Sequence, residues 1–272
     1  MLIPLLDQFF TPAGRVLLDP VLQMFWVFVL TATRLAGLFA AGPVFGQAVV
    51  PHNVRLVLIV ALAFVLTPIA TPESLAVPDG AIQIVPLVGL EFGLGFILGL
   101  GVMTVLSGLQ LAGQLIDQQL GTAFAATINP DLQASVSVTG QMFFILGGAA
   151  LLVMEPVNGD LLMLSALVET FESLPLGQVV LPRETAFVLT QLMHKSMVLG
   201  VRVAAPVLAA LSLVTLTLGF VGRSMPQINQ LSLGFPLRFS TGLFVLGLSL
   251  SGILEAVLEA VPEALSDIQT LF

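Results

Sequence analysis

The stretch AIQIVPLVGLEFGLGFILGLGVMTVLSGLQLAGQLIDQQL, residues 81–120, decides the fold of this chain. It is apolar for most of its length, and only its last part is rich in glutamine. Helical spacing runs through the whole stretch, and an unbroken helix of this size would reach roughly 60 Å, about twice the thickness of a bilayer core. The sequence therefore predicts a helix that bends, breaks or leaves the bilayer.

The composition around this stretch is that of an integral membrane protein. The 272 residues have a mean hydropathy of +1.07, and only 9% of them are charged. Ordinary soluble domains carry about 25% charged residues. The chain is therefore not an ordinary soluble domain, and we expect membrane lipid among its contacts.

Six apolar runs are candidates for crossing the membrane, and two of them are shorter than the roughly 20 residues that a full crossing needs. They are Leu17–Ala41, Leu56–Leu66, Ala81–Leu106, Met142–Met154, Ser196–Val221 and Phe239–Leu258. Residues 225–238 are expected to be a polar connection, and Pro206 is expected to kink the fifth run. We predict an all-α, polytopic integral membrane protein with about six hydrophobic helices. Its long helices should be kinked or broken, and residues 1–272 should form a single membrane domain.

A polar stripe marks the end of the quoted stretch. Gln110, Gln114, Asp117, Gln118 and Gly121 recur at helical spacing, which places them on one helix face. Polar groups are costly in lipid, so this face must meet a polar wall, a water-filled path or the solvent. A short amphipathic helix at headgroup level is the alternative.

Glycines in the first half of the stretch favour close helix packing. Gly89 and Gly93 form one small-xxx-small pair, and Gly95 and Gly99 form another. Such pairs let helix backbones approach each other closely. A dinucleotide-binding loop is the alternative use of these glycines, but the spacing differs and no strand precedes them.

Among the charged side chains inside the apolar runs, Arg34, Glu91 and Arg202 are the candidates for a functional role. A charge at the centre of a membrane helix costs about 2.5–3.5 kcal/mol, so each must be paired or face water. The functional alternative is an ion or proton path, and the structural one is a buried pair or a polar anchor between subunits. We favour the structural one. Glu91 then needs a partner from another run, and a glutamine in its place should keep the hydrogen bonds.

Several functions are disfavoured. The net charge of −8 and the scattered basic residues argue against nucleic acid as a partner. The absence of cysteine excludes a disulfide scaffold and thiolate metal sites, and His52 and His194 lack the spacing of metal ligands. No nucleophile or phosphate-binding motif occurs. We therefore expect no enzyme, no metal and no cofactor. The runner-up function is a small-solute or ion transporter that uses Glu91, Arg202 and Asp117.

A resemblance covers nearly the whole chain. Its stretches are RLAG at 34–37, AGPVF at 41–45, Pro51, Arg55, GQLIDQQLG at 113–121, Phe124, Asn158-Gly159, TFESLP at 170–175, PQIN at 226–229 and GFPL at 234–237. In this order they resemble the FliR/SctT family of flagellar and virulence type III export gates, and the flagellar members more than the injectisome ones. Asp117 stands where many relatives have a glycine.

This resemblance implies a subunit of a helical export-gate assembly in the bacterial inner membrane, at the flagellar basal body. One copy would assemble with FliP and FliQ, work with FlhA and FlhB, and pass unfolded flagellar proteins. Part of the gate would be lifted out of the bilayer plane, so that hydrophobic helices bury against FliP and FliQ. The segment 110–124 would plug the closed channel. The plug residues expected from stripe and resemblance together are Gln110, Gly113, Gln114, Asp117, Gln118, Gly121 and Phe124. Gly113 and Gly121 are expected to give this segment backbone freedom.

Overall fold

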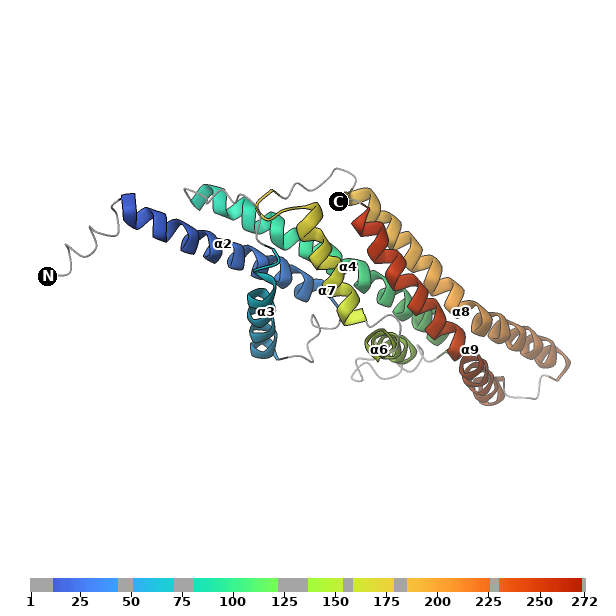
Figure 1. The fold of residues 1–272 in the computed structure, drawn as a ribbon. Coiled ribbons are helices and arrows are strands. Elements are labelled where there is room, and N and C mark those ends of the chain that lie inside the picture. The colour runs from blue at the N-terminus through green and yellow to red at the C-terminus, as the bar shows by residue number, and fades with distance from the viewer. Residues whose placement is uncertain are drawn as a thin grey trace. The chain divides into compact units, whose positions relative to one another are not determined.

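The structure, a computed structural model, describes residues 12–43, 51–70, 81–121, 137–153, 159–178, 185–225 and 230–270. Its helices are α2 (Pro12–Ala41), α3 (His52–Leu66), α4 (Ala81–Leu120), α6 (Val138–Val153), α7 (Gly159–Ser173), α8 (Thr185–Ser224) and α9 (Gln230–Gln269). Figure 1 shows them in chain order from blue to red. The described ranges contain no strand.

The helices confirm the predicted class of polytopic, all-α membrane protein. Four segments are long and apolar enough to cross a membrane: Pro20–Ala41, Gln83–Leu120, Thr185–Ser224 and Gly234–Gln269. The helices α3 and α6 are apolar but shorter, which matches the two short runs in the sequence. The described residues therefore contain six such helices, two of them short, in agreement with the predicted number of about six.

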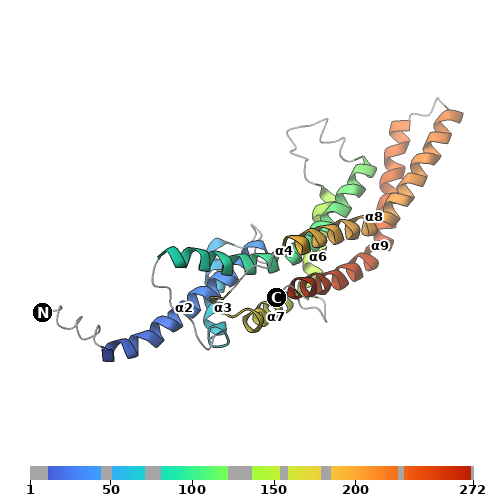
Figure 2. The ribbon, with the colours of Figure 1, turned by 90° about the horizontal axis from the view of Figure 1, so that it is seen from above.

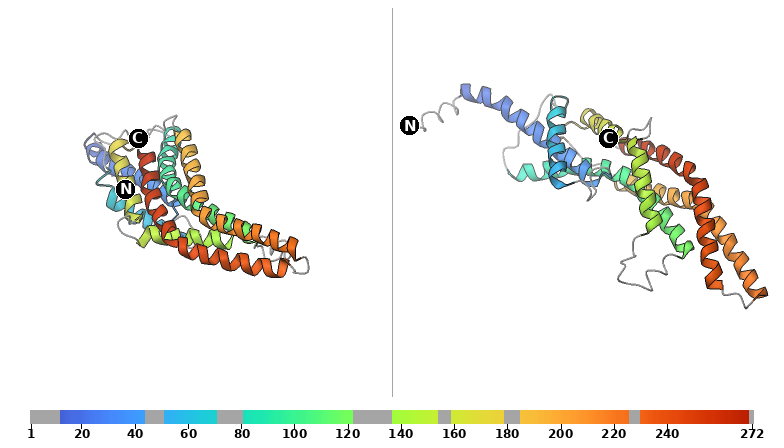
Figure 3. Two further views of the ribbon diagram at one scale, coloured as in Figure 1. Left: turned by 90° about the vertical axis from the view of Figure 1, so that its right-hand side faces the viewer. Right: turned by 90° about the horizontal axis from the view of Figure 1, so that it is seen from below.

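The long helices are continuous, so of the two predicted alternatives, kinked or broken, kinked helices apply. Each of α2, α4, α8 and α9 contains at least one proline and continues through it. Apolar helices tolerate internal proline because neighbouring groups can satisfy the freed carbonyl. For the same reason α9 begins at Gln230 and runs through Pro236, although residues 225–238 read as a connection. The ribbon of α8, which contains Pro206, bends partway along (Figures 2 and 3), in agreement with the predicted kink.

The chain divides into two compact units, and neither is a continuous stretch of sequence. Unit 1 comprises Met1–Leu100, Leu161–Thr185 and Leu265–Phe272. Unit 2 comprises Gly101–Asp160 and Ala186–Ala264. The long helix α4 contributes its first half to unit 1 and its second half to unit 2.

Unit 1 is built where α2 crosses the first half of α4. Its core is made of aliphatic and aromatic side chains from both helices, namely Leu30, Leu35, Leu38, Phe39, Leu94 and Leu98. The short helix α3 packs against α2. Burial of such side chains contributes about 1.5–3 kcal/mol each, which holds α2 and α4 together.

Unit 2 contains the second half of α4, the helix α6 and the hairpin of α8 and α9. These last two helices run side by side in every view (Figures 1, 2 and 3). Within the chain, 28% of the apolar span of α8 and 17% of that of α9 are buried, against 61% for α4. The hairpin therefore exposes apolar surface that lipid or another protein must cover.

Candidate functional site

The polar stripe of α4 divides into outward and inward members. Gln114 and Gln118 are exposed and Gln110 is half-buried, whereas the Asp117 side chain is buried. All of them lie on one helix face, as the spacing predicts, but Asp117 is at the side of that face that meets Ser137 and the start of α6. The exposed part of the stripe therefore carries amides and no charge.

The Asp117 carboxylate holds the start of α6. It accepts hydrogen bonds from the Ser137 hydroxyl at 2.6 Å, from the Thr139 backbone N–H at 3.1 Å and from the Thr139 hydroxyl. The Ser137 hydroxyl oxygen in turn accepts from the backbone N–H of Gly140 at 2.8 Å, which is the usual bond of a helix N-cap. The helix dipole favours a negative charge at this end. These four residues, Asp117, Ser137, Thr139 and Gly140, form the Asp117 network.

Two glycines flank this network and serve different purposes. Gly121 has a φ of 80° and ends α4, with its N–H donated to the Asp117 carbonyl at 3.1 Å. Gly113 lies inside the helix against the backbone of Gly140, and a Cβ there would overlap that backbone. Gly113 is therefore a packing glycine within a continuous helix, which differs from the backbone freedom expected of it. Phe124 lies outside the described residues.

A second network, in unit 1, contains the residue that pairs with Glu91. The Arg34 Nε donates to the Glu91 Oε2 at 2.7 Å, and both side chains are fully buried. The partner thus comes from another apolar run, as the cost of a lone charge in lipid requires. It belongs to the same chain, so the buried-pair alternative describes Glu91 and the anchor between subunits does not.

The remaining polar atoms of this pair are used at the end of α7. The Arg34 guanidinium donates to the Thr170 carbonyl at 3.1 Å, to the Thr170 hydroxyl at 3.0 Å and to the Leu174 carbonyl at 3.1 Å. It lies 4.7 Å from the ring centre of Phe171. The other Glu91 oxygen accepts from the backbone N–H of Gly177 at 2.9 Å. We call these six residues the Arg34–Glu91 network.

The Arg34–Glu91 network bears on the prediction that a glutamine at position 91 keeps the hydrogen bonds of Glu91. Because Arg34 is buried and charged, Glu91 supplies the compensating charge as well as acceptors. The networks also explain what the sequence missed. Thr170 and Leu174 take part largely through backbone carbonyls, which no side-chain pattern reveals.

One of the two predicted glycine pairs of α4, Gly95 and Gly99, packs closely against α2 and the residue that follows it. A Cβ on Gly95 would overlap the Arg34 carbonyl, and one on Gly99 would lie 2.7 Å from the backbone nitrogen of Gly42. Gly37 of α2 approaches the backbone of α4 in the same way. A Cβ on Gly89 would meet no described heavy atom within 4 Å, so Gly89 takes no part in this crossing. Gly93 lies on the same helix and is half-buried.

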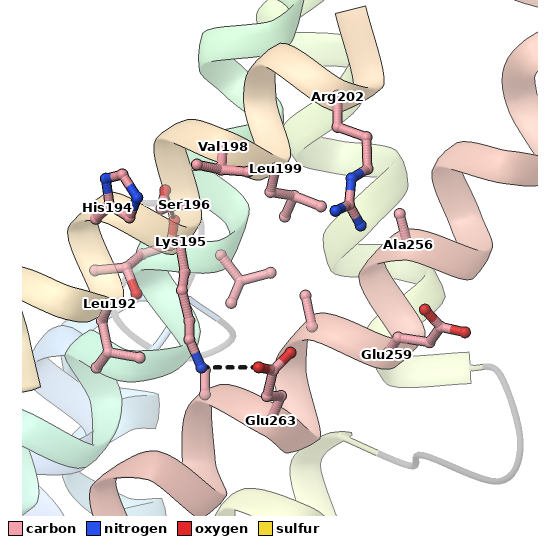
Figure 4. Close-up of a pocket in the computed structure, with 14 residues that line it drawn as sticks. Leu192, His194, Lys195, Ser196, Val198, Leu199, Arg202, Ala256, Glu259 and Glu263 are labelled. Carbon is pink, nitrogen blue, oxygen red and sulfur yellow. Dashed lines mark hydrogen bonds and ion pairs between the residues drawn. The ribbon is translucent and has the colours of Figure 1, made fainter.

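Arg202 lies apart from both networks. It is exposed on α8 and lines a pocket of about 360 Å³ between α4, α8 and α9 (Figure 4). An ion pair of 2.7 Å between Lys195 and Glu263 closes one side of this pocket. Within the described ranges, no group of three or more His, Asp or Glu side chains gathers to hold a metal ion.

Comparison with known proteins places the chain in a family. The sequence pattern of the bacterial export proteins, family 1, matches residues 25–264. The flagellar biosynthetic protein FliR of Bacillus subtilis (strain 168) is 28% identical over 246 residues, which are 88% of this chain and 92% of the relative. The FliR proteins of Escherichia coli (strain K12) and Aquifex aeolicus (strain VF5) are each 28% identical, over 77% and 82% of this chain and 78% and 84% of the relatives. The chain therefore belongs to the bacterial export proteins, family 1.

Proposed function

We propose that this protein is a subunit of the flagellar type III export gate in the bacterial inner membrane. The proposal is supported by the family match over residues 25–264 and by relatives that are named flagellar biosynthetic proteins. It is also supported by the four helices that could cross a membrane. The gate would pass unfolded flagellar proteins, and this role needs no catalytic group and no cofactor.

The proposed partners are FliP and FliQ as neighbouring subunits, with FlhA and FlhB next to the gate. The exposed apolar surface of α8 and α9 is what such partners would cover. Side chains such as Leu213, Phe220 and Phe244 are more than 60% exposed. A membrane protein that folded and worked alone would leave such surface only to lipid, whereas a gate subunit would bury much of it in protein.

The transporter alternative is not favoured. It needs Glu91, Asp117 and Arg202 as a coupled path, but Glu91 is neutralised by Arg34 at 2.7 Å. Asp117 is held by hydroxyl and backbone donors at the start of α6. Carboxylates fixed in this way are poor proton carriers, because each change of charge would break a satisfied network.

Within the gate, we propose that the end of α4 contributes to the plug. The observation that carries this role is the division of the stripe: exposed, uncharged Gln114 and Gln118 lie on one side, and buried Asp117 anchors the other. Exposed amides exchange a neighbour for water at a net cost of only about 0.5–1.5 kcal/mol per hydrogen bond. Such a surface can touch many unfolded chains without holding any of them.

The test of the gate assignment is assembly together with export. The full-length chain with an affinity tag is expressed with FliP and FliQ from the same organism, in cells that lack their own copy of this protein. We expect a stable complex that contains all three proteins, together with restored secretion of flagellar subunits. Flux of a small solute through the purified chain alone, without any complex, would contradict the gate and support a transporter.

A further inference from the structure

The hairpin of α8 and α9 carries an apolar band with charged residues at both edges. On α8 the band lies between Arg202 and Arg223, and on α9 it lies between Arg238 and Glu255, with Glu259 one turn further on. The two intervals correspond to roughly 32 Å and roughly 26 Å of helix, close to the thickness of a bilayer core. Arg202 and Glu259 therefore belong to the same edge of the band, the level of the headgroups beside any lipid that covers it.

Arg202 and Glu259 both line the pocket of about 360 Å³ that Figure 4 shows. They come from facing helices, and both are exposed. The Lys195–Glu263 pair in the same pocket is already satisfied. Within the part of the chain that the structure describes, neither Arg202 nor Glu259 forms an ion pair. One positive and one negative group are thus available to a ligand.

A second pocket of about 380 Å³ adjoins the first, since Arg202 and Ala256 line both. It extends along the hairpin into the apolar band, where Pro206, Leu248 and Ile253 line it. The two pockets together form a groove that is charged at the edge of the band and largely apolar inside it. A phospholipid has the same polarity along its length, with a charged headgroup followed by acyl chains.

We propose that this groove binds a zwitterionic phospholipid of the phosphatidylethanolamine type. The Arg202 guanidinium binds the phosphate, because its planar fork matches phosphate oxygens in two parallel hydrogen bonds. The Glu259 carboxylate accepts hydrogen bonds from the ammonium group. One acyl chain lies along Pro206 and Leu248 in the second pocket.

The charge balance favours this lipid over other occupants. The two basic and two acidic side chains of the first pocket, Lys195, Arg202, Glu259 and Glu263, sum to zero. An anionic headgroup would satisfy Arg202 but leave Glu259 facing a negative charge, and so would a carboxylate from a partner helix. A choline headgroup carries a positive charge but cannot donate an N–H hydrogen bond. The primary ammonium of ethanolamine does both.

The test is lipid binding by the full-length chain in detergent micelles, followed by native mass spectrometry. Dihexanoyl forms of phosphatidylethanolamine, phosphatidylcholine and phosphatidylglycerol are titrated separately. The intact protein should bind the ethanolamine lipid about tenfold more tightly than the glycerol lipid, which is the value of one charge-assisted hydrogen bond. Arg202→Gln should weaken the binding of all three lipids. Glu259→Gln should remove the preference for ethanolamine and leave the glycerol lipid bound.

Two controls make the result decisive. Arg223→Gln removes an exposed arginine at the other edge of the band and should change nothing. Free phosphoethanolamine, which has no acyl chains, should bind at least tenfold more weakly if the apolar pocket contributes. Binding of free phosphoethanolamine as tight as that of the lipid would overturn the lipid assignment. So would equal binding by the intact protein and both pocket variants.

A last arm separates lipid from a protein occupant. In the assembled complex, phosphatidylethanolamine with a photoreactive acyl chain should label peptides that contain Pro206 or Leu248. Labelling should fall several-fold in Arg202→Gln. If these peptides are instead cross-linked to a neighbouring subunit by a photoreactive residue at position 248, and lipid labels nothing there, a partner helix fills the groove and the proposal is wrong.

Discussion

The Arg34–Glu91 network and the Asp117 network each place a buried charge at the end of a neighbouring helix, a cation from α2 in the first and an anion from α4 in the second. In unit 1 a cation, Arg34, binds the carbonyls at the C-terminal end of α7. In unit 2 an anion, Asp117, binds the N–H and hydroxyl groups at the N-terminal end of α6. Each charge has the sign that the helix dipole favours at that end.

The two networks differ in what a missing partner would leave behind. Arg34 and Glu91 are two opposite charges in full burial, so loss of one leaves the other uncompensated. The donors described for Asp117 are neutral hydroxyl and backbone groups near the start of a helix. The Arg34–Glu91 network should therefore contribute more to the free energy of unfolding than the Asp117 network.

The largest expected effect comes from removing one charge of the buried pair. Glu91→Gln and Arg34→Met should each lower the free energy of unfolding by about 3–5 kcal/mol, because the remaining charge is buried without compensation. The double variant should lose less than the sum of the two, measured by equilibrium unfolding in detergent. A Glu91→Gln variant as stable as the intact protein would show that the charge of Glu91 is not needed.

Next in size are the glycines that let helices meet beside each network. Gly95→Ala and Gly113→Ala should each cost about 1–3 kcal/mol, because the added methyl group overlaps a backbone on α2 or α6. Gly89→Ala is the matched control. It meets open space and should gain about 0.5–1 kcal/mol from helix propensity. A destabilised Gly89→Ala in the isolated chain would contradict the packing described for α4.

Changes in the Asp117 network should lower the free energy of unfolding by a smaller amount. Asp117→Ala should cost about 1–2 kcal/mol, because the start of α6 loses an acceptor that the N-cap residue alone cannot replace. Asp117→Asn should cost less, since its carbonyl can still accept from the Thr139 N–H. Hydrogen exchange of the first turn of α6 measures this directly. Equal protection in all three proteins would mean that Asp117 does not hold this end.

The smallest effect on stability belongs to the exposed amides. Gln114→Ala combined with Gln118→Ala should change the free energy of unfolding by no more than about 0.5 kcal/mol, because both side chains face outward. In the proposed plug the same double variant should raise ion leakage through the closed gate, measured as conductance in membranes that contain the complex. If the double variant changed the free energy of unfolding but caused no ion leakage, these side chains would serve helix packing and not the plug.

Much of the fold follows from the sequence because it depends on composition and periodicity. The element predicted over 81–120 has the bounds of α4, since apolar residues and glutamines alike keep helical spacing there. The start of α9 could not be predicted in this way. Pro236 locally favours a turn, and its place inside α9 depends on neighbouring groups that satisfy the freed carbonyl.

The networks were predictable in part. Because a lone charge is costly in lipid, the sequence correctly requires a partner for Glu91 from outside its own run, and the stretches 34–37 and 170–175 are separate parts of the family resemblance. Their meeting at one guanidinium depends on tertiary packing, which leaves no trace in local spacing. Asp117 was assigned to the polar stripe by its spacing. Its inward position depends on Ser137 and Thr139, which follow Asp117 by 20 and 22 residues.

The most direct test of the proposed gate is contact between the end of α4 and a passing substrate. A photoreactive residue replaces Gln118 in the complete export apparatus, and a flagellar subunit fused to a stable domain is stalled during secretion. The account predicts a cross-link between position 118 and the stalled chain, and none from position 244, which lies on an exposed apolar part of α9. Cross-links from position 244 and none from position 118 would contradict it.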